Sequence, residues 1–112
     1  MTMDVAGEEL ADRVRALLTL DADVEEKRMF GTRAFLIDGH ILVGARSRGV
    51  LLVRVDEEHG AELVARPGVE TAVMGPRTMG TGWLDVAPEA LADDADLAFW
   101  LDAAREDASR DR

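Results

Sequence analysis

Residues 34–45 read Ala-Phe-Leu-Ile-Asp-Gly-His-Ile-Leu-Val-Gly-Ala, two short apolar runs joined by Asp-Gly. An Asp-Gly pair between apolar runs is one of the strongest hairpin signals, because both residues of the two-residue turn need positive φ. A further turn signal, Arg46-Ser47-Arg48-Gly49, separates this stretch from a third run, Val50–Val55. Short runs rich in β-branched residues and joined by tight turns are typical of an antiparallel meander. We therefore predict three consecutive antiparallel strands in the middle of the chain.

The third run is predicted to be an inner strand of the sheet. Within it, Leu51, Val53 and Val55 alternate with Val50, Leu52 and Arg54, so both faces are mostly apolar. Weaker strands are predicted at Glu26–Met29 and Val69–Met74, and a final strand at Trp83–Val86. The glycine-rich segment Gly75–Gly82 is interpreted as a loop leading into the last of them.

Helical periodicity appears at both ends of the chain. The first helix is predicted over Asp4–Leu20 with Asp4 as its N-cap. Its inward face is predicted to hold Ala6, Leu10, Ala11, Val14, Leu17 and Leu18. The last helix is predicted from Asp93 or Asp94 to about Ala108, and its inward stripe holds Leu97, Trp100, Leu101 and Ala104. From Arg105 onward charges alternate, and we expect this end to fray.

A shorter helix is predicted to begin after Asp56 and to stop at Arg66-Pro67-Gly68. Gly60 inside it costs about 1 kcal/mol relative to Ala by helix propensity. Pro88–Leu91 suits one helical turn with Pro at its start. The order of elements indicates a single α+β domain spanning 1–112, with 1–3 and 109–112 frayed. We expect a two-layer sandwich in which helices pack on one face of an antiparallel sheet.

The residue types leave little for catalysis. There is no Cys, which excludes thiol nucleophiles and thiolate metal sites, and no Tyr. Two His residues, His40 and His59, are interpreted as surface residues, and neither has a His or carboxylate four positions on. Ser47 and Ser109 fall in a turn and in the tail. The sequence therefore predicts no enzyme, no metal site and no cofactor.

The net charge of −10 argues against a protein that binds nucleic acid through bulk charge. No run approaches the roughly 18 apolar residues of a membrane helix, and the acidic N-terminus is unlike a secretory signal. We expect a soluble, cytoplasmic protein. The preference for Arg over Lys is typical of a bacterial genome rich in G and C.

Charge is uneven along the chain. Residues 27–55 hold six basic residues and one acidic residue, between acidic flanks. One interpretation is structural, with these Arg residues on one sheet face and paired with acidic helices. The other is a site for an anion or an acidic partner, since Arg binds carboxylate and phosphate well. Under the second interpretation the predicted contact group is Lys27, Arg28, Arg54 and Arg77.

Lys27-Arg28-Met29-Phe30-Gly31 resembles the signature that opens the N-terminal domain of the TfoX/Sxy competence-regulator family. Further similar motifs follow in the same order: Ala34-Phe35-Leu36 with Gly39-His40, Leu52-Val53-Arg54-Val55, Arg66-Pro67-Gly68-Val69, Arg77-Thr78-Met79 with Gly82-Trp83, and Pro88-Glu89 with Asp94 to Trp100. The resemblance covers about Leu10 to Trp100. Thr32, Gly60 and Thr78 depart from the family pattern.

The resemblance implies an α+β domain similar to secretion-chaperone folds, without catalytic residues to transfer. It also implies a stand-alone N-terminal domain, because full-length competence regulators carry a second domain. We therefore expect a regulatory or protein-interaction module that binds a protein, or itself as a homodimer, with a link to transcription or competence. The alternative is a small-anion or metabolite binder that uses the Arg group and the Gly75–Gly82 loop.

Overall fold

The Asp38-Gly39 hairpin turn forms as predicted. In the computed structural model the φ angles of Asp38 and Gly39 are 52° and 80°, the left-handed values that this turn requires. The turn joins β2 (Thr32–Ile37) to β3 (His40–Ala45), which pair antiparallel. Leu42 has no partner residue in this register, so β3 carries a bulge there.

The structure describes residues 4–18, 23–29, 31–74, 77–78 and 80–110. The remaining elements are α1 (Val5–Leu17), β1 (Val24–Met29), the 3₁₀ turn η1 (Ser47–Gly49), β4 (Leu51–Arg54), α2 (Glu57–Leu63), β5 (Val69–Thr71), β6 (Val73–Met74), β7 (Arg77–Thr78), β8 (Trp83–Val86), the 3₁₀ turn η2 (Pro88–Leu91) and α3 (Asp94–Arg110).

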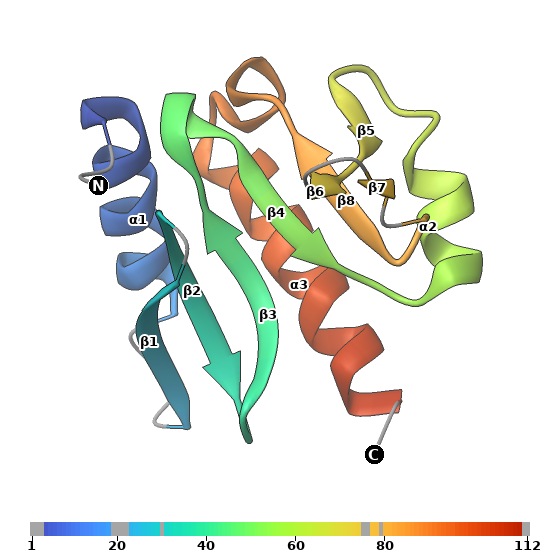
Figure 1. Cartoon of the computed structure of the whole chain (residues 1–112), viewed down its shortest axis with the longest axis horizontal. Helices are drawn as coiled ribbons and strands as arrows, with labels where there is room; N and C mark the ends of the chain where they lie inside the picture. Colours follow the sequence, from blue (N-terminus) through green and yellow to red (C-terminus); the bar gives the residue numbers. More distant parts are fainter. Residues whose placement is uncertain (1–3, 19–22, 30, 75–76, 79, 111–112) are drawn as a thin grey trace.

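Six strands form one antiparallel sheet in the order β1-β2-β3-β4-β8-β5 (Figure 1). β4 lies between β3 and β8, which confirms the predicted inner strand. β6 and β7 form a separate two-stranded sheet, in front of β8 in Figure 1. The plain loop expected over Gly75–Gly82 is therefore wrong in part, because Arg77-Thr78 pairs with Val73-Met74.

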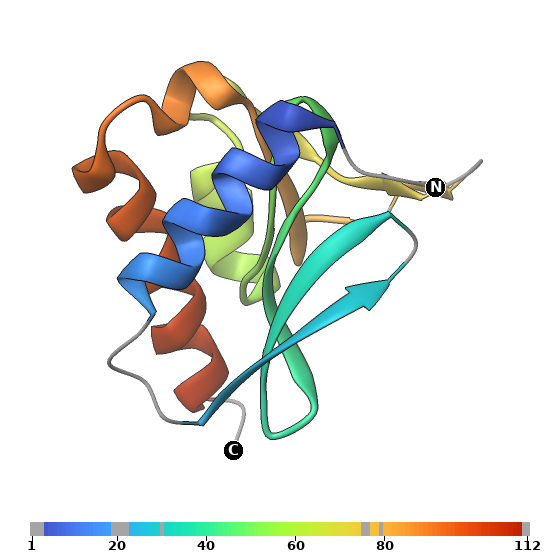
Figure 2. The same ribbon diagram turned by 90° about the vertical axis from the view of Figure 1, so that its left-hand side faces the viewer.

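Helices α1 and α3 lie together on one face of the sheet (Figure 2). The sheet contributes a row of neighbouring residues from four strands, each 0–1% exposed: Phe35, Val43, Val53 and Leu84. Helix α3 contributes the predicted stripe of Leu97, Trp100, Leu101 and Ala104, all buried. This arrangement is the two-layer α+β sandwich that the sequence predicts.

The buried face of α1 is narrower than predicted. Asp4 caps the helix as expected, and its side chain accepts a hydrogen bond from the Gly7 backbone N–H at 2.9 Å. The buried residues are Gly7, Leu10, Ala11, Val14 and Leu18, whereas Ala6 is exposed and Leu17 is 36% exposed. Each residue turns a helix by about 100°, so the buried stripe is centred near Val14. Ala6 and Leu17 fall at its margin.

Helix α3 runs further than predicted. It continues to Arg110 through the segment from Arg105 onward where we expected fraying, and Asp107 within that segment is only 2% exposed. A hydrogen bond from the Asp56 backbone N–H to the Asp107 carboxylate holds this turn of the helix in place. Of the ends expected to fray, residues 1–3 and 111–112 lie outside the described residues.

Helix α2 begins after Asp56 as predicted, but the Asp56 side chain makes no capping hydrogen bond. The helix is short and ends at Leu63, before the Arg66-Pro67-Gly68 stop. The Thr81 hydroxyl donates to the Glu57 carbonyl at 2.9 Å, and the Val55 N–H donates to the Gly82 carbonyl at 3.0 Å. These bonds hold the segment before β8 directly against α2.

Candidate functional site

The predicted contact group is spread over three strands: Lys27 and Arg28 in β1, Arg54 in β4 and Arg77 in β7. Lys27 and Arg28 are consecutive strand residues, so their side chains point to opposite faces. Arg28 pairs with Arg33, which contacts Glu8 of α1, so Arg28 lies on the helix side. Lys27 therefore shares the helix-free face with Arg54, three strands away. The Arg77 side chain lies outside the described part of the chain.

Arg54 and Trp83 form a contact on the helix-free face. They are register partners in β4 and β8, and the guanidinium carbon of Arg54 lies 5.8 Å from the centroid of the Trp83 ring. Both side chains are half-buried. Among the described residues Arg54 makes no ion pair with a carboxylate. This is a cation stacked on an aromatic ring with its hydrogen-bond donors left for another molecule.

Other basic residues of the central segment are used within the fold. Glu26 accepts hydrogen bonds from Arg15 at 2.8 and 2.9 Å and from Arg33 at 2.9 Å. Arg46 donates to Asp85 at 2.8 Å. The structural interpretation is thus correct for Arg33, which pairs with Glu8 of α1, and wrong for the partner of Arg46, which is Asp85 of β8 and not a helix residue. Arg54 remains the candidate contact residue with a defined geometry.

The Glu26 network predicts an acid-sensitive contribution to stability. The hydrogen bonds from Arg15, and then those from Arg33, hold the pKa of Glu26 below its ordinary value of 4.5. The unfolded chain therefore takes up this proton first, so the stabilisation is present above pH 4.5 and is lost as pH falls through the lower, folded pKa. We expect Glu26→Gln to remove this part of the decline in urea-unfolding free energy between about pH 5 and pH 3.

The control for that experiment is Glu25→Gln, which changes the charge equally at the exposed neighbouring position. It should leave the pH dependence close to that of the wild type. Equal pH profiles for the wild type and Glu26→Gln would contradict the assignment of the acid-sensitive contact to Glu26.

Asp107 of α3 joins the end of that helix to the start of α2. Its Oδ2 accepts a hydrogen bond from the Asp56 backbone N–H at 3.0 Å and lies 2.9 Å from Nδ1 of His59. The expected surface position is confirmed for His40, which is exposed, and is wrong for His59, whose side chain is only 26% exposed. The cavity beside Asp107 has a volume of about 10 Å³, room for about one water. We interpret this contact as structural.

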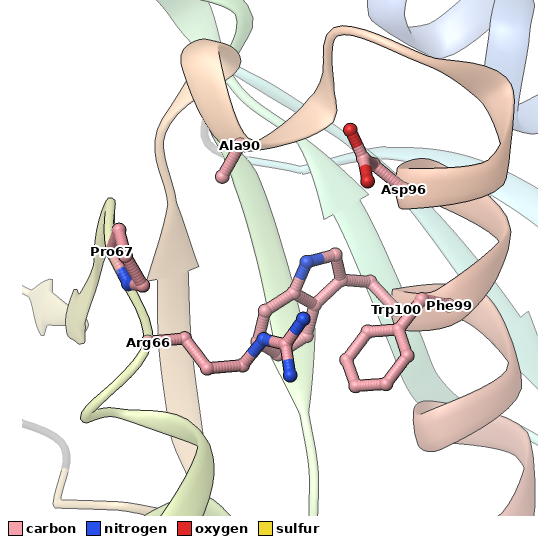
Figure 3. A pocket seen from close by; sticks show the side chains of 6 residues that line it. All are labelled: Arg66, Pro67, Ala90, Asp96, Phe99 and Trp100. Carbon is pink, nitrogen blue, oxygen red and sulfur yellow. The ribbon is translucent and has the colours of Figure 1, made fainter.

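A larger surface pocket, of about 170 Å³, lies beyond the end of α2 (Figure 3). Its lining residues are Arg66, Pro67, Ala90, Asp96, Phe99 and Trp100. The Arg66 guanidinium carbon lies 4.3 Å from the centroid of the Phe99 ring and 5.9 Å from that of Trp100. The Phe99 and Trp100 rings meet edge to face with centroids 5.2 Å apart. The pocket thus combines a cation with two aromatic rings.

Sequence reasoning missed both the Asp107 contact and this pocket. A signal for Asp107 was present, since Trp100, Ala104 and Asp107 continue one helical stripe at spacings of four and three. No such signal existed for the pocket, because Arg66 and Trp100 come from separate elements that periodicity does not relate. Among the described residues no group of three or more His, Asp or Glu could hold a metal ion. None of the helices they form is both long enough and apolar enough to cross a bilayer.

Comparison with known proteins gives two matches. The family model of the TfoX N-terminal domain matches residues 16–108. The crystal structure of a protein from Pseudomonas syringae, a structural-genomics target, superposes with a TM-score of 0.62 at 10% sequence identity, covering 83% of this chain and 93% of the other. A search of the curated proteins gives no match. At this identity the structural likeness supports the fold alone.

Proposed function

Because the chain belongs to the family of the TfoX N-terminal domain, we propose that it is a non-enzymatic regulatory module that acts by binding a protein. The partner is either a different protein or a second copy of this chain. The process regulated is gene expression, including the competence genes that full-length members of the family control. This last part of the proposal depends on the family alone.

The observation that carries the interaction proposal is the Arg54–Trp83 stack on the helix-free face. Arg and Trp are the residue types that most often dominate binding energy at protein interfaces. The stack holds the guanidinium in one orientation, so less conformational entropy is lost when it binds a carboxylate. Lys27 adds a second positive charge on the same face. An acidic surface on the partner would be complementary to this face.

A small anion is the alternative ligand for the same face. It is less favoured because the net charge of −10 opposes the approach of free anions. The aromatic ring beneath Arg54 also offers apolar contact area that a protein side chain uses better than a phosphate does. Nucleic acid is the least favoured partner, since its phosphates meet the same repulsion.

The test is affinity capture with the double variant Arg28→Glu/Arg54→Glu beside the wild type. The single variant Arg54→Glu separates the helix-free face from Arg28. The control is Arg13→Glu, a charge reversal in the helical layer, where Arg13 pairs with the exposed Asp94 at 3.2 Å. We expect Arg54→Glu to lower affinity for the captured protein at least about tenfold, the equivalent of about 1.4 kcal/mol. Arg13→Glu should leave that affinity unchanged.

Sedimentation of the same proteins tests self-association. If the partner is a second copy, the wild type and Arg13→Glu should dimerise and Arg54→Glu should sediment as a monomer. Equal recovery of every protein by the wild type and Arg54→Glu, with equal sedimentation, would show that this face is not the contact surface.

A further inference from the structure

The pocket beyond α2 is built from three separate parts of the chain. Arg66 and Pro67 follow the end of α2, Ala90 belongs to η2, and Asp96, Phe99 and Trp100 belong to the first two turns of α3. Figure 3 shows these side chains around one open space. Its volume of about 170 Å³ is comparable to the roughly 150 Å³ of a cavity that holds benzene. The pocket therefore has room for a small molecule.

Trp100 offers a hydrogen bond into this pocket. Its side chain is only 2% exposed, and in Figure 3 the nitrogen edge of its indole faces the space bounded by Ala90 and Asp96. Within the described part of the chain the indole N–H makes no hydrogen bond. The indole nitrogen itself is not fully buried, so a water or a ligand atom in the pocket can accept this hydrogen bond.

Arg66 is a second donor whose side chain makes no hydrogen bond to the described residues. Its guanidinium is held over the Phe99 ring, and among the described residues it forms no ion pair with a carboxylate. Stacking orients the planar guanidinium while leaving its N–H groups directed outward. Two donors of this kind suit the two oxygens of a carboxylate.

Asp96 gives the pocket the opposite charge as well. Its side chain is exposed and, within the described residues, pairs with no Lys or Arg, Arg66 included. A simple anion would be attracted by Arg66 but repelled by Asp96 and by the net charge of −10. A ligand that carries an ammonium beside its carboxylate has no net charge and satisfies both residues.

We propose that this pocket binds a free α-amino acid with a small apolar side chain. The carboxylate accepts hydrogen bonds from Arg66 and from the Trp100 indole N–H. The ammonium donates to Asp96, and the side chain packs against Phe99, Pro67 and Ala90. The proposal is independent of the protein-binding face, because the pocket lies beside α3 on the helix side of the sheet, and either proposal can fail without the other.

The test uses L-alanine, L-valine and L-leucine as probes at concentrations up to roughly millimolar. Binding is followed by the fluorescence of Trp100 in a Trp83→Phe background and by the melting temperature of the wild type. We expect a saturable fluorescence change and a melting temperature that rises with amino-acid concentration, because the ligand binds only the folded state. Absence of both signals with all three amino acids would overturn the proposal.

Two variants locate the ligand's charged groups. Arg66→Gln and Asp96→Asn should each weaken binding at least about tenfold. Their matched controls, Arg13→Gln and Asp93→Asn, make the same charge changes outside the pocket and should bind as the wild type does. Unchanged binding by Arg66→Gln would show that the ligand occupies another site.

Analogues distinguish a dipolar ligand from a simple anion. Isovalerate is valine without its ammonium group, isobutylamine is valine without its carboxylate, and inorganic phosphate has neither an ammonium nor an apolar body. Each should bind at least about tenfold more weakly than the amino acids, and Asp96→Asn should leave isovalerate binding unchanged or improved. Isovalerate or phosphate binding as tightly as valine would overturn the assignment of Asp96 to an ammonium group.

Discussion

Gly60→Ala is expected to destabilise the protein by about 1–3 kcal/mol, although helix propensity by itself predicts a gain of about 1 kcal/mol. A Cβ placed on Gly60 would overlap the carbonyl oxygen of Thr81. The overlapping atom belongs to the backbone, so it cannot rotate away as a side chain would. It is also held close, because the Thr81 hydroxyl donates to the Glu57 carbonyl in the same helix.

Urea unfolding of the wild type and Gly60→Ala measures this effect. Ala61→Gly is the control, since Ala61 is exposed in the same helix and reports only propensity there. It should cost about 1 kcal/mol. If Gly60→Ala is as stable as the wild type or more so, the close approach of α2 to the segment before β8 is wrong.

Asp107→Ala is expected to lower stability by about 1–3 kcal/mol and the melting temperature by roughly 4–12 °C. The substitution leaves the Asp56 backbone N–H and the His59 ring without the carboxylate that they contact at 3.0 and 2.9 Å. Because the site is closed to solvent on the α3 side, water replaces the lost acceptor poorly. The change should loosen both the end of α3 and the start of α2.

Glu106→Ala provides the matched control, because Glu106 is an exposed acidic residue on the same turn of α3. It should shift the melting temperature by much less. Asp107→Asn keeps an acceptor oxygen of the same size and should retain part of the lost stability. Equal melting temperatures for Asp107→Ala and Glu106→Ala would mean that the last turns of α3 are frayed, as the alternating charges alone suggest.

These two residues show where sequence-based prediction ended. Propensity treats Gly60 as a defect in a weak helix, and charge alternation treats Asp107 as part of a solvated tail. Both interpretations use only neighbours within a turn or two. The contacts that overturn them join Gly60 to Thr81 and Asp56 to Asp107, residues that are far apart along the chain.

The candidate site shows the same difference between what neighbouring residues predict and what the strand pairing decides. Sequence grouped Lys27, Arg28 and Arg54, which lie in the basic stretch 27–55, with Arg77 of the Gly75–Gly82 segment. Strand alternation puts Lys27 and Arg28 on opposite faces, and the strand order puts Arg54 three strands from β1. Trp83, which holds Arg54 in place, becomes its neighbour only because β4 pairs with β8.

The sequence by itself determined the Asp38-Gly39 hairpin, the inner strand at Val50–Val55, the inward stripe of the last helix and the α+β class. Turn conformation and hydrophobic periodicity are properties of a few consecutive residues, and burial of one face follows from them. Only the tertiary structure decided the β6–β7 pair, the Gly60 and Asp107 contacts, and the pocket shared by Arg66, Asp96 and Trp100. Each of these depends on how close two separately formed elements pack, and local preferences carry no information about that distance.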